Sequence, residues 1–139
     1  MTEAQNKANA YLLEIRNAEK EINEMILKID YLRYKASGAT AIRYDKDHVQ
    51  TSPGDMVCEA IVEAVSIENK RFAKHKRLVD MRERTHEICQ LWGDNCSKLI
   101  ETYYLSRGSM GDVARVIGCS DRSAYRIKLD ALERFSKHL

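Results

Sequence analysis

An uninterrupted apolar seam at the start of the chain constrains its fold more than any other feature. From Thr2 to about Lys35 no residue breaks a helix, and apolar side chains recur at alternating spacings of four and three, which predicts one long helix. The seam comprises Ala4, Ala8, Tyr11, Ile15, Ala18, Ile22, Met25, Ile29 and Leu32. Such a helix is not stable alone in water, because its apolar side needs a partner. The sequence therefore requires a second helix, from this chain or from another subunit.

A second long helix is expected from Pro53 to about Trp92. The segment SPGD at 52–55 combines a serine cap, a proline at the first helical position and a carboxylate three residues after the cap, which is a helix start. One apolar face is expected from Val57, Ile61, Val65 and Phe72, and a later one from Leu78, Met81, Ile88 and Trp92. Residues 1–93 then form a long, coiled-coil-like helical hairpin with a loop at about 37–51. The same seam would equally serve a homodimer through the N-terminal helices, so both pairings stay open.

Composition supports an all-α protein and argues against several other classes. The chain of 139 residues has six glycines and one proline, which implies few turns. No apolar run approaches the length of a membrane span, and the N-terminus lacks the pattern of a signal peptide. The four cysteines, at 58, 89, 96 and 119, form no CxxC pair and have no histidine at zinc spacing. We therefore expect a cytoplasmic protein with reduced core cysteines, no metal and no cofactor.

Residues 94–139 are expected to form a second domain of three helices. The first runs from Asn95 to about Leu105, and the second from about Met110 to Ile117 after a serine-x-x-acid capping box, SMGD at 109–112. A very short turn, Gly118-Cys119-Ser120, leads to a third helix that begins at Asp121. Apolar side chains at helical spacing, namely Val113, Ala114, Ile117, Ala124, Ile127, Ala131 and Phe135, give the last two helices facing sides. This is the pattern of a DNA-binding helix-turn-helix supported by a third helix.

The candidate DNA-binding residues lie on the first turns of the last helix and just before it. Because Ala124 and Ile127 are expected in the core, the side chains around them point outward. Arginine can pair with guanine, and serine or tyrosine can hold a phosphate. Asp121 fits least well, because a carboxylate there repels phosphate, although it favours a helix N-terminus. The full candidate set is Ser120, Asp121, Arg122, Ser123, Tyr125, Arg126 and Lys128, with Arg115 from the preceding helix.

The stretch YYLSRGSMGDVARVIGCSDRSAYRIKLDALERF resembles region four of bacterial sigma factors. The whole layout also resembles the ArpU- and RinA-like phage transcriptional regulators, with the strongest similarity over about Asn95 to Leu139. One departure is Ala124, where a bulkier branched residue is more usual. The resemblance implies a cytoplasmic regulator, in a bacterial host, of phage late genes or of a prophage region. It further implies that the helix 121–138 binds the major groove of double-stranded DNA and that the protein contacts RNA polymerase.

Two other functions compete with this interpretation. A DNA-packaging protein similar to a terminase small subunit also joins a helix-turn-helix to an oligomerisation region, and a coiled-coil adaptor would bind proteins and no DNA. The basic run KRFAKHKR at 70–77 could contact phosphates. The alternative is an exposed helix turn whose charges are solvated and could pair with Glu14, Glu19, Glu21 and Glu24 of the first helix. Catalytic motifs are lacking, and His86 with Cys89 is better explained by packing than by nucleophilic chemistry. We therefore expect no enzyme.

Overall fold

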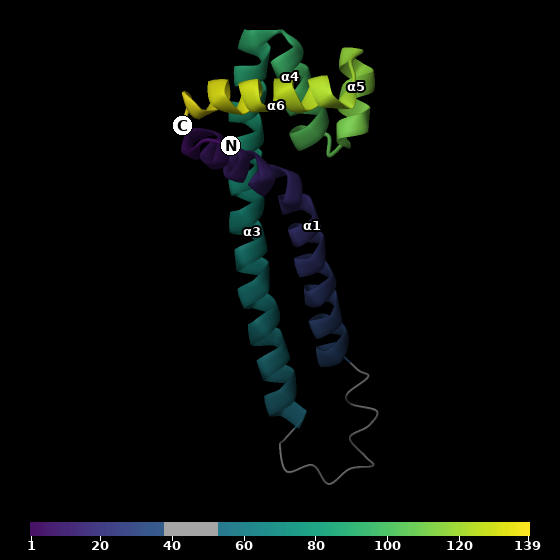
Figure 1. Cartoon of the computed structure of the whole chain (residues 1–139). Helices are drawn as coiled ribbons and strands as arrows, with labels where there is room; N and C mark the ends of the chain where they lie inside the picture. The colour runs from purple at the N-terminus through teal and green to yellow at the C-terminus, as the bar shows by residue number, and fades with distance from the viewer. Residues whose placement is uncertain (38–52) are drawn as a thin grey trace. The chain divides into compact units, whose positions relative to one another are not determined.

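The computed structural model describes residues 1–37 and 53–139, and every regular element in these ranges is helical (Figure 1). The elements are α1 (Glu3–Ser37), α3 (Pro53–Trp92), α4 (Asn95–Leu99), the π-helix η1 (Ile100–Leu105), α5 (Met110–Ile117) and α6 (Asp121–Ser136). The all-α fold expected from the sequence is confirmed, and the bounds of both long helices agree with expectation to within about two residues. Of the loop expected at 37–51, Ser37 belongs to α1. The other residues of this loop, and the expected cap at Ser52, lie outside the described residues. None of the helices described is long and apolar enough to cross a membrane.

The chain divides into two compact units, each of which takes part of both long helices. Unit 1 contains residues 1–19 and 77–139, and unit 2 contains residues 20–76. The domains expected from the sequence, 1–93 and 94–139, follow a different division. The difference arises because the first part of α1 and the last part of α3 belong to the same unit as the C-terminal helices.

Unit 2 is an antiparallel helical hairpin. Leu32 of α1 packs with Ala60 and Ala64 of α3, and Ala36 and Ile67 lie against this small cluster. Two ion pairs link the helices, Lys28 with Glu63 at 3.6 Å and Glu21 with Lys74. As residue numbers fall along α1 they rise along α3, so the helices run in opposite directions. In this unit the two long helices therefore pair within one chain.

The face of α3 that contacts α1 is not the one expected from the sequence. The buried stripe of unit 2 is Ala60, Ala64 and Ile67, one residue earlier than the expected line through Ile61 and Val65. Ile61 is 50% exposed, Val65 55% and Phe72 67%. The physical reason is size: alanines allow two helix backbones to approach closely, whereas larger side chains are accommodated on the flank. A prediction that assigns the largest apolar residues to the contact therefore misses this stripe by one position.

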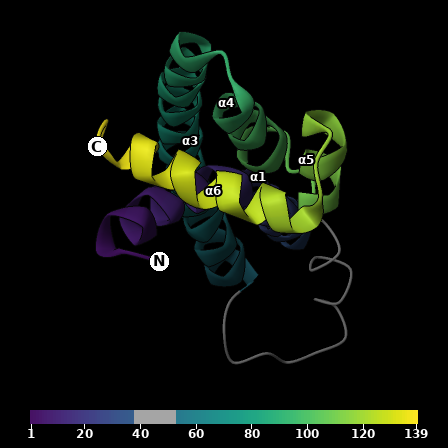
Figure 2. The ribbon, with the colours of Figure 1, turned by 45° about the horizontal axis from the view of Figure 1, so that its top comes forward.

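In unit 1, α1 and α3 contribute buried residues along with the C-terminal helices. The helices α4, η1, α5 and α6 pack on one another, and the N-terminal end of α1 lies beside α6 in both views (Figures 1 and 2). The Tyr11 and Phe135 rings lie 5.6 Å apart, and Gln5 Nε2 donates to the Leu129 carbonyl oxygen at 3.2 Å. The buried apolar residues of this unit are Ala8, Leu12, Ile15, Ala18, Leu78, Met81, Ile88, Cys89, Leu99, Ile100, Tyr104, Val113, Ala114, Ala124, Ala131, Leu132 and Phe135. The helix-turn-helix is thus completed by helices from the other end of the chain.

The helix expected from Asn95 to about Leu105 changes its winding after one turn. α4 ends at Leu99, and η1 continues as a π-helix to Leu105. At its end the N–H of Ser106 donates to the Glu101 carbonyl oxygen at 2.8 Å, five residues back. Tyr104 is fully buried and its hydroxyl donates to Asn9 Oδ1 of α1 at 2.7 Å. The π-helical segment is therefore the part of this helix whose Tyr104 contacts α1. Short π-helical segments are rare and are frequently found at functional sites.

Candidate nucleic-acid interface

The first helix of the motif, α5, begins with the capping box expected from the sequence. Ser109 Oγ accepts from the Asp112 N–H at 3.1 Å, and Asp112 Oδ2 accepts from the Ser109 N–H at 2.9 Å. These two bonds satisfy backbone donors that a helix start leaves without partners inside the helix. The carboxylate of Asp112 also pairs with Arg115 one turn later. The start of α5 is therefore held by local interactions that the sequence alone predicts.

The turn between α5 and α6 depends on Gly118. Its backbone adopts a left-handed conformation, φ 81° and ψ 40°, and the N–H groups of Gly118 and Cys119 donate to the Ala114 carbonyl oxygen at 2.8 and 3.0 Å. This closes the C-terminus of α5 in the way that glycine commonly does. Ser120 then caps α6, because its Oγ accepts from the Ser123 N–H at 3.2 Å. The three-residue turn and the start of α6 at Asp121 are both confirmed.

The inward side of the motif agrees closely with the expected core. Val113 and Ala114 of α5 are buried, and so are Ala124, Ala131 and Phe135 of α6. Ile117 and Ile127 are half-buried, while Leu132, which was not among the expected core residues, is fully buried. Because small alanines lie where the two helices meet, α5 and α6 pack closely. This packing determines which α6 side chains face solvent.

The outward side of α6 presents two arginines at its start. Arg122 and Arg126 are exposed, and among residues 1–37 and 53–139 no carboxylate forms an ion pair with either of them. Tyr125 lies between them in sequence and is 54% exposed. A spacing of four places the two guanidinium groups on one side of the helix. The first two turns of α6 therefore present an exposed aromatic ring and two exposed cations, and neither cation forms an ion pair with a described carboxylate.

The remaining candidates at the start of α6 have local roles as well. Ser120 and Ser123 bond to each other, with Ser120 Oγ donating to Ser123 Oγ at 3.1 Å. Asp121 is exposed in the first helical turn, where a carboxylate interacts favourably with the helix dipole. Ser120 is thus engaged in capping. Two carboxylates lie close to the arginines along α6, Asp121 beside Arg122 and the exposed Asp130 one helical turn after Arg126.

Two of the predicted DNA contacts, Lys128 and Arg115, have partners within the chain. Lys128 is half-buried and its Nζ lies 5.0 Å from the centre of the Tyr103 ring, on the side of α6 that meets η1. Arg115 is exposed but pairs with Asp112 on its own helix. The structure therefore brings Arg122, Tyr125 and Arg126 together on one surface and directs Lys128 elsewhere. A contribution of Lys128 or Arg115 to DNA binding stays a prediction.

The exposed surface of the motif also includes apolar side chains that the sequence analysis did not select. Leu129 is 40% exposed and follows Tyr125 by four residues, so it extends the same side of α6. Val116 on α5 is 55% exposed. The signal available in the sequence was the spacing of Leu129 from Arg122 and Tyr125, which places all three on one helical face.

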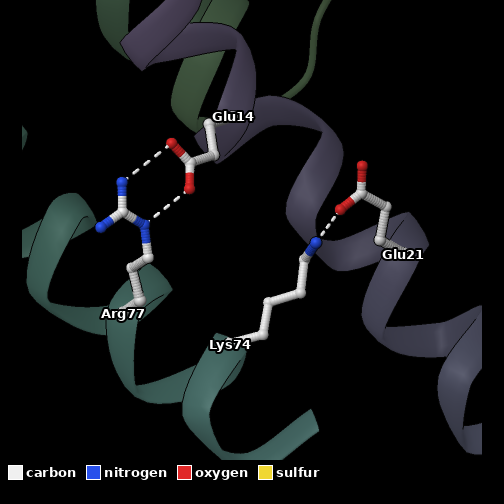
Figure 3. A network of polar contacts seen from close by, with 4 residues as sticks. All are labelled: Glu14, Glu21, Lys74 and Arg77. Atoms are coloured by element: carbon white, nitrogen blue, oxygen red, sulfur yellow. Dashed lines mark hydrogen bonds and ion pairs between the residues drawn. The ribbon is translucent and has the colours of Figure 1, made fainter. Parts of the chain in front are cut away.

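Several cations of the basic run at 70–77 form ion pairs with glutamates, as expected if the run does not serve to bind nucleic acid. In unit 1, Arg77 donates to Glu14 through Nε at 2.6 Å and Nη2 at 3.2 Å, and in unit 2 Lys74 bonds Glu21 (Figure 3). Arg71 pairs with Glu68 on α3 itself. Glu19, also expected as a partner, pairs instead with Arg82 at 3.6 Å and Arg107 at 3.0 Å. Three of the five cations in this run are therefore engaged within the chain.

The cysteines are free thiols in differing surroundings. Cys89 is buried, and burial together with the nearby charges of Glu101 and Asp94 raises its pKa to about 12. A thiol with this pKa is not a nucleophile near neutral pH. His86, three residues away, contacts Gln90 and Glu101. Cys58 is exposed, so the expectation that all four cysteines are core residues is wrong for it, because α3 turns its alanine stripe rather than this side toward α1.

No group of three or more His, Cys, Asp or Glu side chains in the described ranges could hold a metal ion. Comparisons of the chain with family models, with curated proteins and with solved structures found no match. The surface around Arg122 and Arg126 is therefore the candidate functional site on chemical grounds, and the comparisons add no family to the argument.

Proposed function

We propose that this chain is a DNA-binding transcriptional regulator that places α6 in the major groove of double-stranded DNA. The observation that carries the proposal is the pair of exposed arginines, Arg122 and Arg126, without carboxylate partners among the described residues. They lie on the first turns of a helix that follows a tight turn, the geometry in which a recognition helix presents its N-terminal residues to base edges. Guanidinium groups bind both guanine edges and phosphates.

The biological process is proposed from the resemblance of residues 95–139 to sigma factor region four and to ArpU- and RinA-like regulators. We propose control of phage late genes or of a prophage region, with a contact to RNA polymerase and action in the cytoplasm of a bacterial host. A homodimer through the N-terminal helices would present two copies of α6, and a dimer commonly matches a two-fold related pair of half-sites. The order of the chain, with the helix-turn-helix last, favours regulation over DNA packaging.

The test is binding of the full chain to DNA with and without the two arginines. Fluorescence anisotropy is measured with labelled duplexes of about 30 base pairs taken from upstream promoter regions, between about 50 and 200 mM salt. Binding of the native chain should weaken as salt rises, because phosphate contacts release counterions. Arg122→Ala combined with Arg126→Ala should weaken binding, and where both arginines contact phosphates it should reduce the slope of log K against log salt by about 1.8.

A matched control removes two positive charges elsewhere in unit 1. Lys98 on α4 and Lys137 after α6 are exposed, and changing both to alanine should leave the affinity within about twofold, because surface charges beyond a Debye length are screened. Circular dichroism confirms that both double variants remain helical. Binding that is insensitive to salt, or equal for the native chain and the arginine variant, would contradict the proposal and favour an adaptor function.

A further inference from the structure

The hairpin of unit 2 buries a small core and leaves large apolar side chains exposed. Its buried apolar residues are Ile22, Ile29, Leu32, Ala60 and Ala64, so α3 contributes only alanines. Exposed in the same unit are Ile26, Leu27, Tyr31, Tyr34, Ile61, Val62, Val65 and Phe72. A pair of helices gains most of its stability from packing of its apolar faces. A hairpin with this distribution is expected to gain stability from a further partner.

The exposed residues fall on two different sides of the hairpin. On α1, Leu27 and Tyr31 each lie two positions from Ile29, which places them opposite the side that meets α3. On α3, Ile61, Val65, Glu68 and Phe72 follow a spacing of four, three and four, and we call these four residues the flanking stripe. The stripe lies one residue beyond the alanines that contact α1, so it borders the junction of the two helices.

A groove runs beside the flanking stripe. It has a volume of about 400 Å³, and its apolar lining includes Leu32 and Ala36 of α1 with Ile61, Ala64 and Val65 of α3. Arg33 also lines it, and Ile26, which is 37% exposed, lies two helical turns earlier on the same side of α1. The flanking stripe and this groove therefore form one continuous, mainly apolar surface within unit 2.

The only charge of the flanking stripe is compensated within the chain. Glu68 Oε1 accepts from Arg71 Nε at 3.1 Å and also from Arg71 Nη2. The hydrogen bond from Arg71 lowers the pKa of Glu68, against a smaller opposing effect of desolvation, and the charge of Arg33 acts in the same direction as Arg71. A partner packed on the stripe consequently meets a carboxylate that already has its counter-charge.

We propose that the flanking stripe and its groove form the contact between two copies of this chain, with the two α3 helices antiparallel. A two-fold axis between Val65 and Glu68 lays the stripe on itself, so that Phe72 of each copy lies opposite Ile61 of the other and beside the groove. The parallel order would instead set Phe72 against Phe72 and Glu68 against Glu68, and would leave both grooves without a side chain to fill them. Self-complementarity of the stripe therefore selects a second copy as its occupant.

The available area is sufficient for a modest dimer. From their exposed fractions, Ile26, Ile61, Val65 and Phe72 offer together roughly 350 Å² of apolar surface per copy. Interfaces are commonly somewhat more than half apolar, so each copy would bury roughly 600 Å², toward the low end of stable interfaces. We expect dissociation in the micromolar range. This dimer does not rest on DNA binding, and its test contains no DNA.

The experiment is sedimentation of the full chain over a range of concentrations from about 1 to 200 µM, which brackets that dissociation constant. The native chain should change from monomer to dimer within this range. Val65→Glu and Phe72→Glu should each weaken dimerisation at least about tenfold, since each places a charge in an apolar contact. The matched control is Leu27→Glu, because Leu27 is 68% exposed, as Phe72 is 67%, but lies on the other side of the hairpin. The control should dimerise like the native chain.

Because all three substituted side chains are exposed, the variants should keep their helical circular dichroism. A native chain that stays monomeric throughout the range would overturn the proposal. So would equal weakening by Leu27→Glu, or dimerisation unaffected by Val65→Glu and Phe72→Glu. Larger assemblies that persist in both stripe variants would point to the side with Leu27 and Tyr31 and would also overturn it.

Cys58 can be used to test whether the two α3 helices of the proposed dimer are antiparallel or parallel. It is exposed, and it precedes Val65 by seven residues, so it lies on the same side of α3 as the flanking stripe. In the antiparallel order the two Cys58 residues lie about 25 Å apart along the helices, whereas in the parallel order they face each other. Mild oxidation should give no covalent dimer that depends on Cys58, judged against Cys58→Ser. A Cys58-dependent covalent dimer would contradict the antiparallel contact.

Discussion

Arg16 donates a hydrogen bond from Nη1 to the carbonyl oxygen of Gly108 at 2.8 Å and thereby ties the N-terminal helix to the turn before α5. The same nitrogen bonds the Tyr103 carbonyl oxygen, and the guanidinium carbon lies 4.2 Å from the centre of the Tyr103 ring. One side chain of α1 therefore donates to a carbonyl group of η1 and to one in the turn that follows it. The position of α5 depends on this contact across 92 residues of sequence.

Arg16→Ala should lower the free energy of unfolding by about 2–3 kcal/mol, because two partly buried carbonyl groups lose a charged donor. Arg16→Lys should lie between the native chain and the alanine variant, since an ammonium group keeps the charge but lacks the planar guanidinium group that lies over the Tyr103 ring. Urea denaturation followed by circular dichroism measures both. An alanine variant as stable as the native protein would show that water replaces Arg16 at no cost.

Gly108 and Gly111 should respond in opposite directions to the same substitution. A Cβ at Gly108 would lie 2.9 Å from the Thr102 backbone oxygen, so Gly108→Ala should destabilise by about 1–3 kcal/mol. At Gly111 the nearest atom to a Cβ is Ser109 Oγ at 3.5 Å, and the residue lies within α5. Gly111→Ala should therefore stabilise by about 0.5–1 kcal/mol. Thermal and urea unfolding of both variants would show the sign of each effect. A Gly108→Ala variant as stable as the native chain would contradict the steric argument, and a destabilised Gly111→Ala would contradict the prediction for α5.

Asp112 should add an acid-sensitive contribution to stability. The Ser109 N–H, with further effects of the Ser109 side chain and of Arg115, lowers the pKa of Asp112 below 3.8. A carboxyl group with a depressed folded-state pKa stabilises the fold above its unfolded value and loses that contribution as the pH falls through the folded value. The stability difference between the native chain and Asp112→Asn should therefore be present at about pH 5 and shrink toward about pH 2. Asp80→Asn, at an exposed position of α3, is the control and should show little such trend.

Asp121 should oppose DNA binding. It is exposed at the start of α6, next to Arg122, so its carboxylate repels phosphate if this end of the helix contacts DNA. Asp121→Asn should tighten binding to duplexes of unrelated sequence by roughly two- to fivefold, as expected for removing one unfavourable surface charge. Anisotropy at low salt is the measurement. Weaker binding to one particular sequence, with tighter binding to the others, would indicate that Asp121 accepts a hydrogen bond from a cytosine there.

Cys58 and Cys89 should differ sharply in reactivity. Cys58 is exposed, whereas Cys89 is 1% exposed with a pKa raised to about 12 by burial and by the charges of Glu101 and Asp94. In dilute native protein at about pH 8, a disulfide reagent should modify Cys58 within minutes and Cys89 only after denaturation. Comparison with Cys58→Ser identifies the fast phase. Rapid modification of Cys89 without denaturant would mean that unit 1 opens locally at α3.

Much of the candidate site was predictable because its determinants are local. Ser109 with Asp112, Gly118, and Ser120 before Asp121 specify where α5 ends and α6 begins, and each acts on backbone groups within a few residues. The outward positions of Arg122 and Arg126 follow from helical spacing once Ala124 is assigned to the core. Helical spacing alone does not give the half-buried position of Lys128, because its Nζ lies 5.0 Å from the centre of the Tyr103 ring of η1.

By itself, the sequence determined the all-α class, the bounds of the long helices and the two capped helices of the motif, because periodicity and capping operate over a few residues. Only the tertiary structure decided that α3 meets α1 through Ala60 and Ala64, leaving Val65 and Phe72 exposed. The tertiary structure also decided that Arg16 of α1 donates a hydrogen bond to the Tyr103 carbonyl oxygen of η1. These features depend on how closely two helix backbones approach and on which distant polar groups need a hydrogen-bond partner. The spacing of residues along the sequence gives neither of these.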